Sequence, residues 1–159
     1  MPLDSAALSR DLAQEIAALR AFVAVLRDEQ QTLVHGALER LALFAAPKAQ
    51  CLLDLTQLGE CRLALLRAHE LPADRTGMQR LLREHAASAP EASAAWQQVL
   101  SLTADAYRLN DLNGTLIATR LRGTQQALTA LFSAARIPGA YAADGSTVPF
   151  HTAHKLAIA

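Results

Sequence analysis

Residues 91–135 read EASAAWQQVLSLTADAYRLNDLNGTLIATRLRGTQQALTALFSAA, the longest regular pattern in this chain of 159 residues. Large apolar residues recur along it at steps of three, four and seven, which predicts one face of an α-helix. This face comprises Trp96, Leu100, Tyr107, Ile117, Leu121, Leu128 and Leu131. Ile137-Pro138-Gly139 then ends the pattern, because proline and glycine both interrupt helices. We therefore expect one long helix over residues 91–135.

Two more long helices are predicted upstream, at about residues 4–34 and 37–70. The first carries an apolar stripe at three- and four-residue steps, and Gly36 marks the corner after it. The stripe consists of Leu8, Leu12, Ile16, Leu19, Val23, Leu26 and Leu33. The second helix contains Pro47, which should bend or divide it. A short connector helix is expected at about residues 76–87.

Composition agrees with helix-on-helix packing. Hydrophobic residues make up 52% of the chain but aromatic residues only 4%, so alanine and leucine dominate the apolar content. Three long helices with short connections predict an all-α fold, an elongated antiparallel three-helix bundle with an irregular C-terminal tail. We expect a bundle domain at residues 1–137 and a flexible tail at residues 138–159.

The centre of the last helix leaves several alternatives open. Leu102, Leu109, Leu112 and Leu116 form a second apolar set, which either faces a partner or is wrapped by the bundle. Asn110 falls on the main apolar face, where an amide would fix helix register, and Gly114 would let a neighbouring helix approach. Asn113-Gly114 also fits a turn, which would cut the helix in two.

Charge and hydropathy exclude several classes of protein. Lys plus Arg and Asp plus Glu number 15 each, so the net charge is zero and no basic face for nucleic acid is expected. The longest apolar run, residues 41–46, is far shorter than the roughly 20 residues of a membrane-spanning helix. The first residues lack the basic and apolar regions of a secretion signal. A cytoplasmic location without membrane insertion is expected.

The sequence holds no recognisable catalytic constellation. A phosphate-binding loop, a dinucleotide-binding turn, a nucleophile elbow and a His-Glu-x-x-His zinc pair are all missing from it. Cys51 and Cys61 have no second Cys/His pair to complete a zinc site, so two buried structural thiols are expected. We therefore expect neither an enzyme nor a metal or cofactor site.

Three segments together resemble the FlgN family of flagellar type III export chaperones. They are Asp28-Glu29-Gln30-Gln31-Thr32-Leu33, Leu109-Asn110-Asp111-Leu112-Asn113-Gly114 with the following Gln125-Gln126-Ala127-Leu128, and Tyr141-Ala142-Ala143-Asp144-Gly145. Lys48, followed by Leu52-Leu53, is similar to the family's second helix. The order and spacing of these segments span nearly the whole chain. Ala142 departs from the family pattern, which has glycine after the tyrosine.

The resemblance implies a cytoplasmic chaperone for hook-associated proteins, which join the flagellar hook to the filament. Such a chaperone holds a helical region near the C-terminus of its cargo, prevents premature association and delivers the cargo to the flagellar export gate. The implied cargo-binding residues are Leu109, Leu112, Asn113, Leu116 and Leu128. The implied gate-binding residues are Tyr141, Asp144 and Gly145, although Tyr141 could instead cap the bundle. The alternative is a structural helical protein whose apolar face closes a homodimer.

Overall fold

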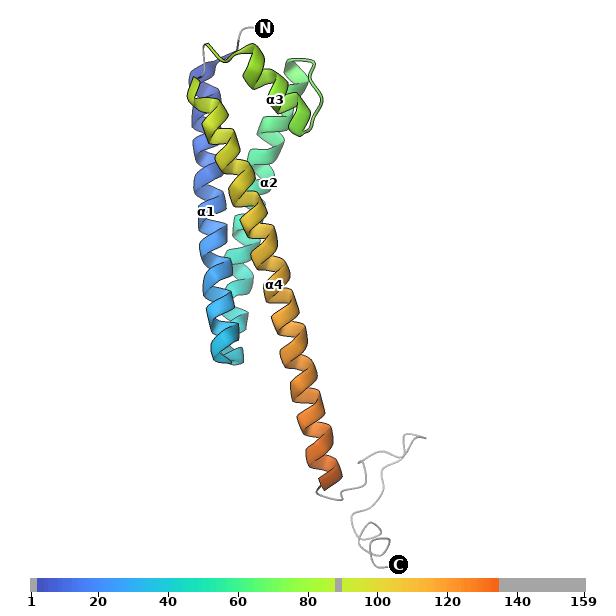
Figure 1. The fold of residues 1–159 in the computed structure, drawn as a ribbon. Coiled ribbons are helices and arrows are strands. Elements are labelled where there is room, and N and C mark those ends of the chain that lie inside the picture. Colours follow the sequence, from blue (N-terminus) through green and yellow to red (C-terminus); the bar gives the residue numbers. More distant parts are fainter. Residues whose placement is uncertain (1–2, 88–89, 135–159) are drawn as a thin grey trace, which may run out of the picture. The chain divides into compact units, whose positions relative to one another are not determined.

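The structure, a computed structural model, describes residues 3–87 and 90–134 (Figure 1). Its elements are α1 (Ser5–His35), the 3-10 helix η1 (Leu38–Phe44), α2 (Ala45–Ala68), α3 (Arg75–Glu84) and α4 (Pro90–Ala134). These two ranges contain helices and no strand, which confirms the predicted all-α class. The predicted tail, residues 138–159, lies outside them.

The chain divides into two compact units, Met1–Thr115 and Leu116–Ala159, with the boundary inside α4. In unit 1, α1, α2 and the first part of α4 lie side by side, and α3 packs with them near the start of α1 (Figure 1). This packing is the helical bundle expected from the three long apolar patterns. In unit 2, residues 116–134 continue the helix to its end at Ala134.

Both ends of α1 follow from identifiable capping residues. The Asp4 carboxylate accepts hydrogen bonds from the amides of Ala6 and Ala7 at 3.1 and 3.0 Å. At the other end Gly36 adopts a left-handed conformation with φ 77°, and backbone bonds from Gly36 to Leu33 and from Ala37 to Thr32 close the last turn. All residues of the predicted stripe are buried, together with Phe22.

Pro47 divides the second predicted helix, as expected. The chain forms η1 first, and α2 begins at Ala45, so that Pro47 falls in the first turn of the α-helix. The amides of a first turn have no acceptor within the helix, so the missing proline N–H costs no hydrogen bond there. Leu52 is exposed, and Leu66 is the one fully buried residue of α2.

The connector helix α3 is capped by Asp74. Its carboxylate accepts bonds from the Thr76 hydroxyl and from the amides of Thr76 and Gly77, and these bonds lower the pKa of Asp74. A Cβ atom at Gly77 would overlap the Pro72 carbonyl oxygen, so this position requires glycine. The helix buries Met78, Leu81 and Leu82 against α1, α2 and α4.

The buried face of α4 differs from the predicted one. The residues that it buries are Ala92, Trp96, Val99, Ala106, Leu109 and Asn113. Tyr107, expected on the buried face, is 76% exposed, and Asn110 is exposed while Asn113 is buried. The small alanines let α4 approach its neighbours, so the core follows them rather than the larger side chains. The alternative turn at Asn113-Gly114 is wrong, because both residues are helical. Open space surrounds the position that a Cβ atom of Gly114 would occupy.

Candidate functional site

A buried polar cluster joins three helices of unit 1. Glu29 of α1 is 5% exposed, and both its carboxylate oxygens accept hydrogen bonds from Lys48 Nζ of α2, at 3.1 and 3.0 Å. Asn113 of α4 donates from Nδ2 to Glu29 Oε2 and to the Leu26 carbonyl oxygen, both at 2.8 Å. The segments that carry the family resemblance therefore supply all three side chains of one cluster.

This cluster sets how α4 lies against α1. A buried carboxylate requires compensation, which the Lys48 ammonium and the Asn113 amide provide. Sliding α4 by one turn would remove Asn113 from both of its acceptors and leave Glu29 with less compensation. A single polar residue at a buried helix position is the usual device for fixing register. The Asn113 side chain is therefore a positioning group within unit 1.

A second polar contact lies nearer the start of α1. Arg62 of α2 forms an ion pair with the buried Glu15 carboxylate of α1, and its guanidinium lies 5.2 Å from the centre of the Trp96 ring of α4. This contact again joins α1, α2 and α4. Glu15 and Glu29 both fall at three- or four-residue steps within the apolar stripe of α1. A carboxylate in such a stripe is the sequence signal that could have predicted both contacts.

The five predicted cargo-binding residues differ in how exposed their side chains are. Leu109 and Asn113 are buried in unit 1 and offer little accessible surface, so for Leu109 the structure favours the alternative in which the bundle wraps the helix. Leu112 of unit 1 is 42% exposed. In unit 2, Leu116 is half-buried and Leu128 is 49% exposed. Of the predicted residues, Leu112 in unit 1 and, separately, Leu116 and Leu128 in unit 2 keep accessible side-chain surface.

Unit 2 exposes an unusually apolar helical surface. Its exposed large apolar residues are Ile117, Leu121, Leu128, Leu131 and Phe132. Four of these recur at three-, four- and seven-residue steps, so they share one face of the helix. Residues 116–134 contain two arginines, Arg120 and Arg122, and no Asp or Glu. A concentrated apolar surface of this kind marks a protein interaction site.

Several sequence expectations concern other parts of the chain. Tyr141, Asp144 and Gly145 lie outside the described residues. Cys51 is partly buried, as expected, but Cys61 is exposed, so the prediction of two buried thiols is wrong for Cys61. Burial, followed by the negative charge of Asp54, raises the pKa of the Cys51 thiol.

Two features are absent from residues 3–87 and 90–134. Neither range brings together three His, Cys, Asp or Glu side chains that could hold a metal ion. Across the same ranges, none of the helices is both long and apolar enough to cross a membrane.

Within residues 3–87 and 90–134, a helical bundle and an exposed apolar helix face are typical of protein-binding modules. Comparison with known families matches residues 1–149 to the FlgN protein family, a range that includes every helix described above and the segment Tyr141–Gly145. This chain therefore belongs to the FlgN family, whose members are flagellar export chaperones. Neither the curated proteins nor the solved structures gave a match.

Proposed function

We propose that this FlgN protein binds hook-associated proteins in the cytoplasm, prevents their premature association and delivers them to the flagellar export gate. Family membership supplies the chaperone role. The observation that carries the cargo-binding part is the apolar surface of unit 2, where Leu121, Leu128 and Leu131 are each about half exposed or more. An amphipathic cargo helix is the partner that such a face fits.

The cargo contacts in this proposal are the accessible leucines of α4. Leu128 and Leu116 lie in unit 2, and Leu112 in unit 1 supplies a further exposed apolar side chain. Removing each such side chain from water contributes about 1.5–3 kcal/mol before the cost of ordering is subtracted. Leu109 and Asn113 support cargo binding indirectly, because they hold α4 in place within unit 1.

The gate contact is assigned to the tail. In this proposal residues 1–137 form the chaperone domain, and Tyr141, beside Asp144 and Gly145, is the aromatic anchor within residues 138–159. One ring can dominate a small interface, since aromatic residues are common among binding hot spots. Tyr141→Ala should keep cargo affinity in solution while reducing export in cells; equal loss of both would assign the tail to cargo binding or to the fold.

The same face of unit 2 also supports a second candidate, self-association. Ile117, Leu121, Leu128 and Leu131 follow the spacing of a coiled-coil seam, which a second copy of the chain could cover. Light scattering distinguishes the two candidates. The chaperone proposal predicts a stable mixed complex when the C-terminal helical region of a hook-associated protein is added. A homodimer whose mass stays unchanged after that addition would contradict it.

A further inference from the structure

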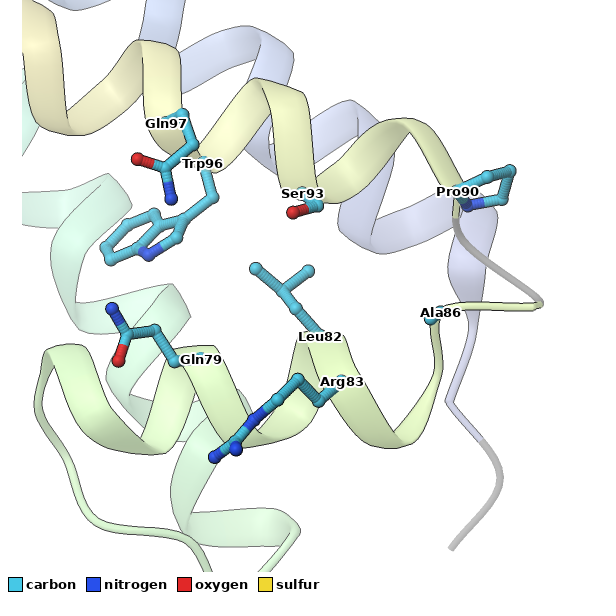
Figure 2. Close-up of a pocket in the computed structure, with 8 residues that line it drawn as sticks. All are labelled: Gln79, Leu82, Arg83, Ala86, Pro90, Ser93, Trp96 and Gln97. Carbon is cyan, nitrogen blue, oxygen red and sulfur yellow. The ribbon is translucent and has the colours of Figure 1, made fainter.

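A groove in unit 1 lies between α3 and the first turns of α4. Figure 2 shows the residues that line it: Gln79, Leu82, Arg83, Ala86, Pro90, Ser93, Trp96 and Gln97. Its volume is about 420 Å³, which falls within the range of small-ligand and short-peptide sites. Leu82 and Trp96 form an apolar floor, because both side chains are buried.

Trp96 brings an unpartnered donor to this groove. The residue is 4% exposed, and its indole Nε1 has no hydrogen-bond partner among residues 3–87 and 90–134. Figure 2 shows the indole between the two helices, with its nitrogen on the side toward α3. A buried N–H without an acceptor is unfavourable, so a ligand that supplies an acceptor would stabilise this position.

The polar side chains around the groove favour an anion. Arg83 is the charged residue among those that line it, and Ser93, Gln79 and Gln97 add groups that can donate hydrogen bonds. Pro90 and Ser93 belong to the first turn of α4, where the helix dipole favours negative charge, and the acidic residue of that turn, Glu91, does not line the groove. The nearby Glu84 is directed to Arg80, at 3.7 Å, and does not line the groove.

We propose that this groove binds an acidic peptide segment in which an apolar side chain stands next to a carboxylate. The apolar side chain would pack on Leu82 and the Trp96 ring, an acceptor of the peptide would accept a hydrogen bond from the Trp96 indole N–H, and the carboxylate would accept hydrogen bonds from Arg83. Peptide binding in this groove does not depend on the cargo surface of unit 2. A variant can therefore lose binding at one of the two sites and keep it at the other. The chain would then have a second docking surface, which lies in unit 1.

Tryptophan fluorescence provides a direct test, because Trp96 is the one tryptophan of the sequence. The intact chain is titrated to about 1 mM, a concentration that detects weak binding, with acetyl-Leu-Glu-Ala-Leu-Glu-amide. The matched neutral peptide, acetyl-Leu-Gln-Ala-Leu-Gln-amide, is titrated in parallel. The acidic peptide should give a saturable change in emission and shift the single indole N–H signal in an NMR spectrum. The neutral peptide should bind at least about tenfold more weakly.

Two arginine variants localise the effect. Arg83→Gln should weaken the acidic peptide about tenfold, because a charge-assisted hydrogen bond is lost. Arg80→Gln is the matched control, since Arg80 is an exposed residue of the same helix that does not line the groove. Circular dichroism checks that both variants fold.

Four results would overturn the proposal. The first two are the absence of a saturable change in emission with the acidic peptide, and equal affinities for the acidic and the neutral peptide. The third is an equal loss of affinity for the acidic peptide in Arg83→Gln and Arg80→Gln. The fourth is an emission that depends on protein concentration alone. The last result would assign the groove to a second copy of the chain.

Discussion

Asn113 of α4 donates a hydrogen bond to Glu29 of α1 at 2.8 Å, although 84 positions separate the two residues in the sequence. The same amide nitrogen reaches the Leu26 carbonyl oxygen, so one side chain joins α4 to both the backbone and a buried carboxylate of α1. Asn113-Gly114 resembled a family motif at a cargo surface. In the structure Asn113 is an interior residue of unit 1.

Replacing Asn113 should therefore reduce stability. Asn113→Ala leaves Glu29 with one partner fewer and opens a small cavity, so we expect the free energy of unfolding to fall by about 2–4 kcal/mol. Urea denaturation measures this loss. Asn110→Ala is the control, because Asn110 is exposed and its removal should change stability by less than about 0.5 kcal/mol. Equal effects of the two substitutions would contradict the assignment of Asn113 as the buried amide.

The pair Lys48–Glu29 should show strong energetic coupling. Lys48→Met leaves the Glu29 carboxylate buried beside an apolar side chain, which should cost about 3–5 kcal/mol. Adding Glu29→Met removes that unpaired charge, so the double variant should be more stable than Lys48→Met alone. A double-mutant cycle by urea denaturation tests this prediction. Strictly additive effects would show that the two side chains do not interact in solution.

Leu109 and Leu112 should respond differently to the same change. Leu109 is 5% exposed and packs with Phe22 and Leu26, so Leu109→Ala should cost about 2–5 kcal/mol. Leu112 is 42% exposed, and Leu112→Ala should cost less than about 1 kcal/mol. Thermal unfolding of the two variants measures the difference. A larger loss for Leu112 would reverse the assignment of the buried face of α4.

The cap of α3 should depend on pH. Hydrogen bonds from Thr76 and Gly77 lower the pKa of Asp74 in the folded chain. A lowered carboxyl pKa stabilises the fold above the unfolded value of about 4, and this contribution is lost as pH falls through the folded pKa. Asp74→Ala should therefore lower the melting temperature at pH 7 more than at pH 2–3. A constant difference across this range would contradict a role for the ionised cap.

The two thiols should react at different rates. Cys61 is exposed, whereas burial and the charge of Asp54 raise the pKa of the Cys51 thiol and reduce its reactive thiolate at pH 8. A thiol-specific reagent should modify Cys61 first, as followed by mass spectrometry. In a Cys61→Ser background, Asp54→Asn should speed the modification of Cys51. An unchanged rate would show that the Asp54 charge does not reach the thiol.

The helices could be predicted because their boundaries depend on nearby residues. Asp4 and Gly36 cap α1 through contacts with residues a few positions away. Pro47 fits an α-helix only in its first turn, and it lies in the first turn of α2. The buried face of α4 could not be predicted in the same way. Two apolar patterns overlap along that helix. The buried pattern contains the small residues Ala92 and Ala106, which are missed when only large apolar residues are used to find the periodicity.

The candidate site was predicted only in part for a related physical reason. The residue types Glu29, Lys48 and Asn113 are visible in the sequence, but their meeting depends on how three separate helices pack. The sequence predicts that Ile117, Leu121, Leu128 and Leu131 share one helix face, and the structure shows that these side chains are exposed. The spacing of leucines indicates which residues share a helix face. It does not indicate whether another helix of the same chain covers that face.

In the proposed function the exposed leucines of α4 bind a helical cargo. Calorimetric titration of Leu128→Asp with the C-terminal helical region of a hook-associated protein tests this binding. Gln126→Asp is the control, because Gln126 is an exposed residue of the same helix and receives the same charge. Leu128→Asp should weaken binding at least about tenfold with an unchanged melting temperature, and Leu112→Asp should act in the same direction. Equal affinities for Leu128→Asp and Gln126→Asp would contradict the claim.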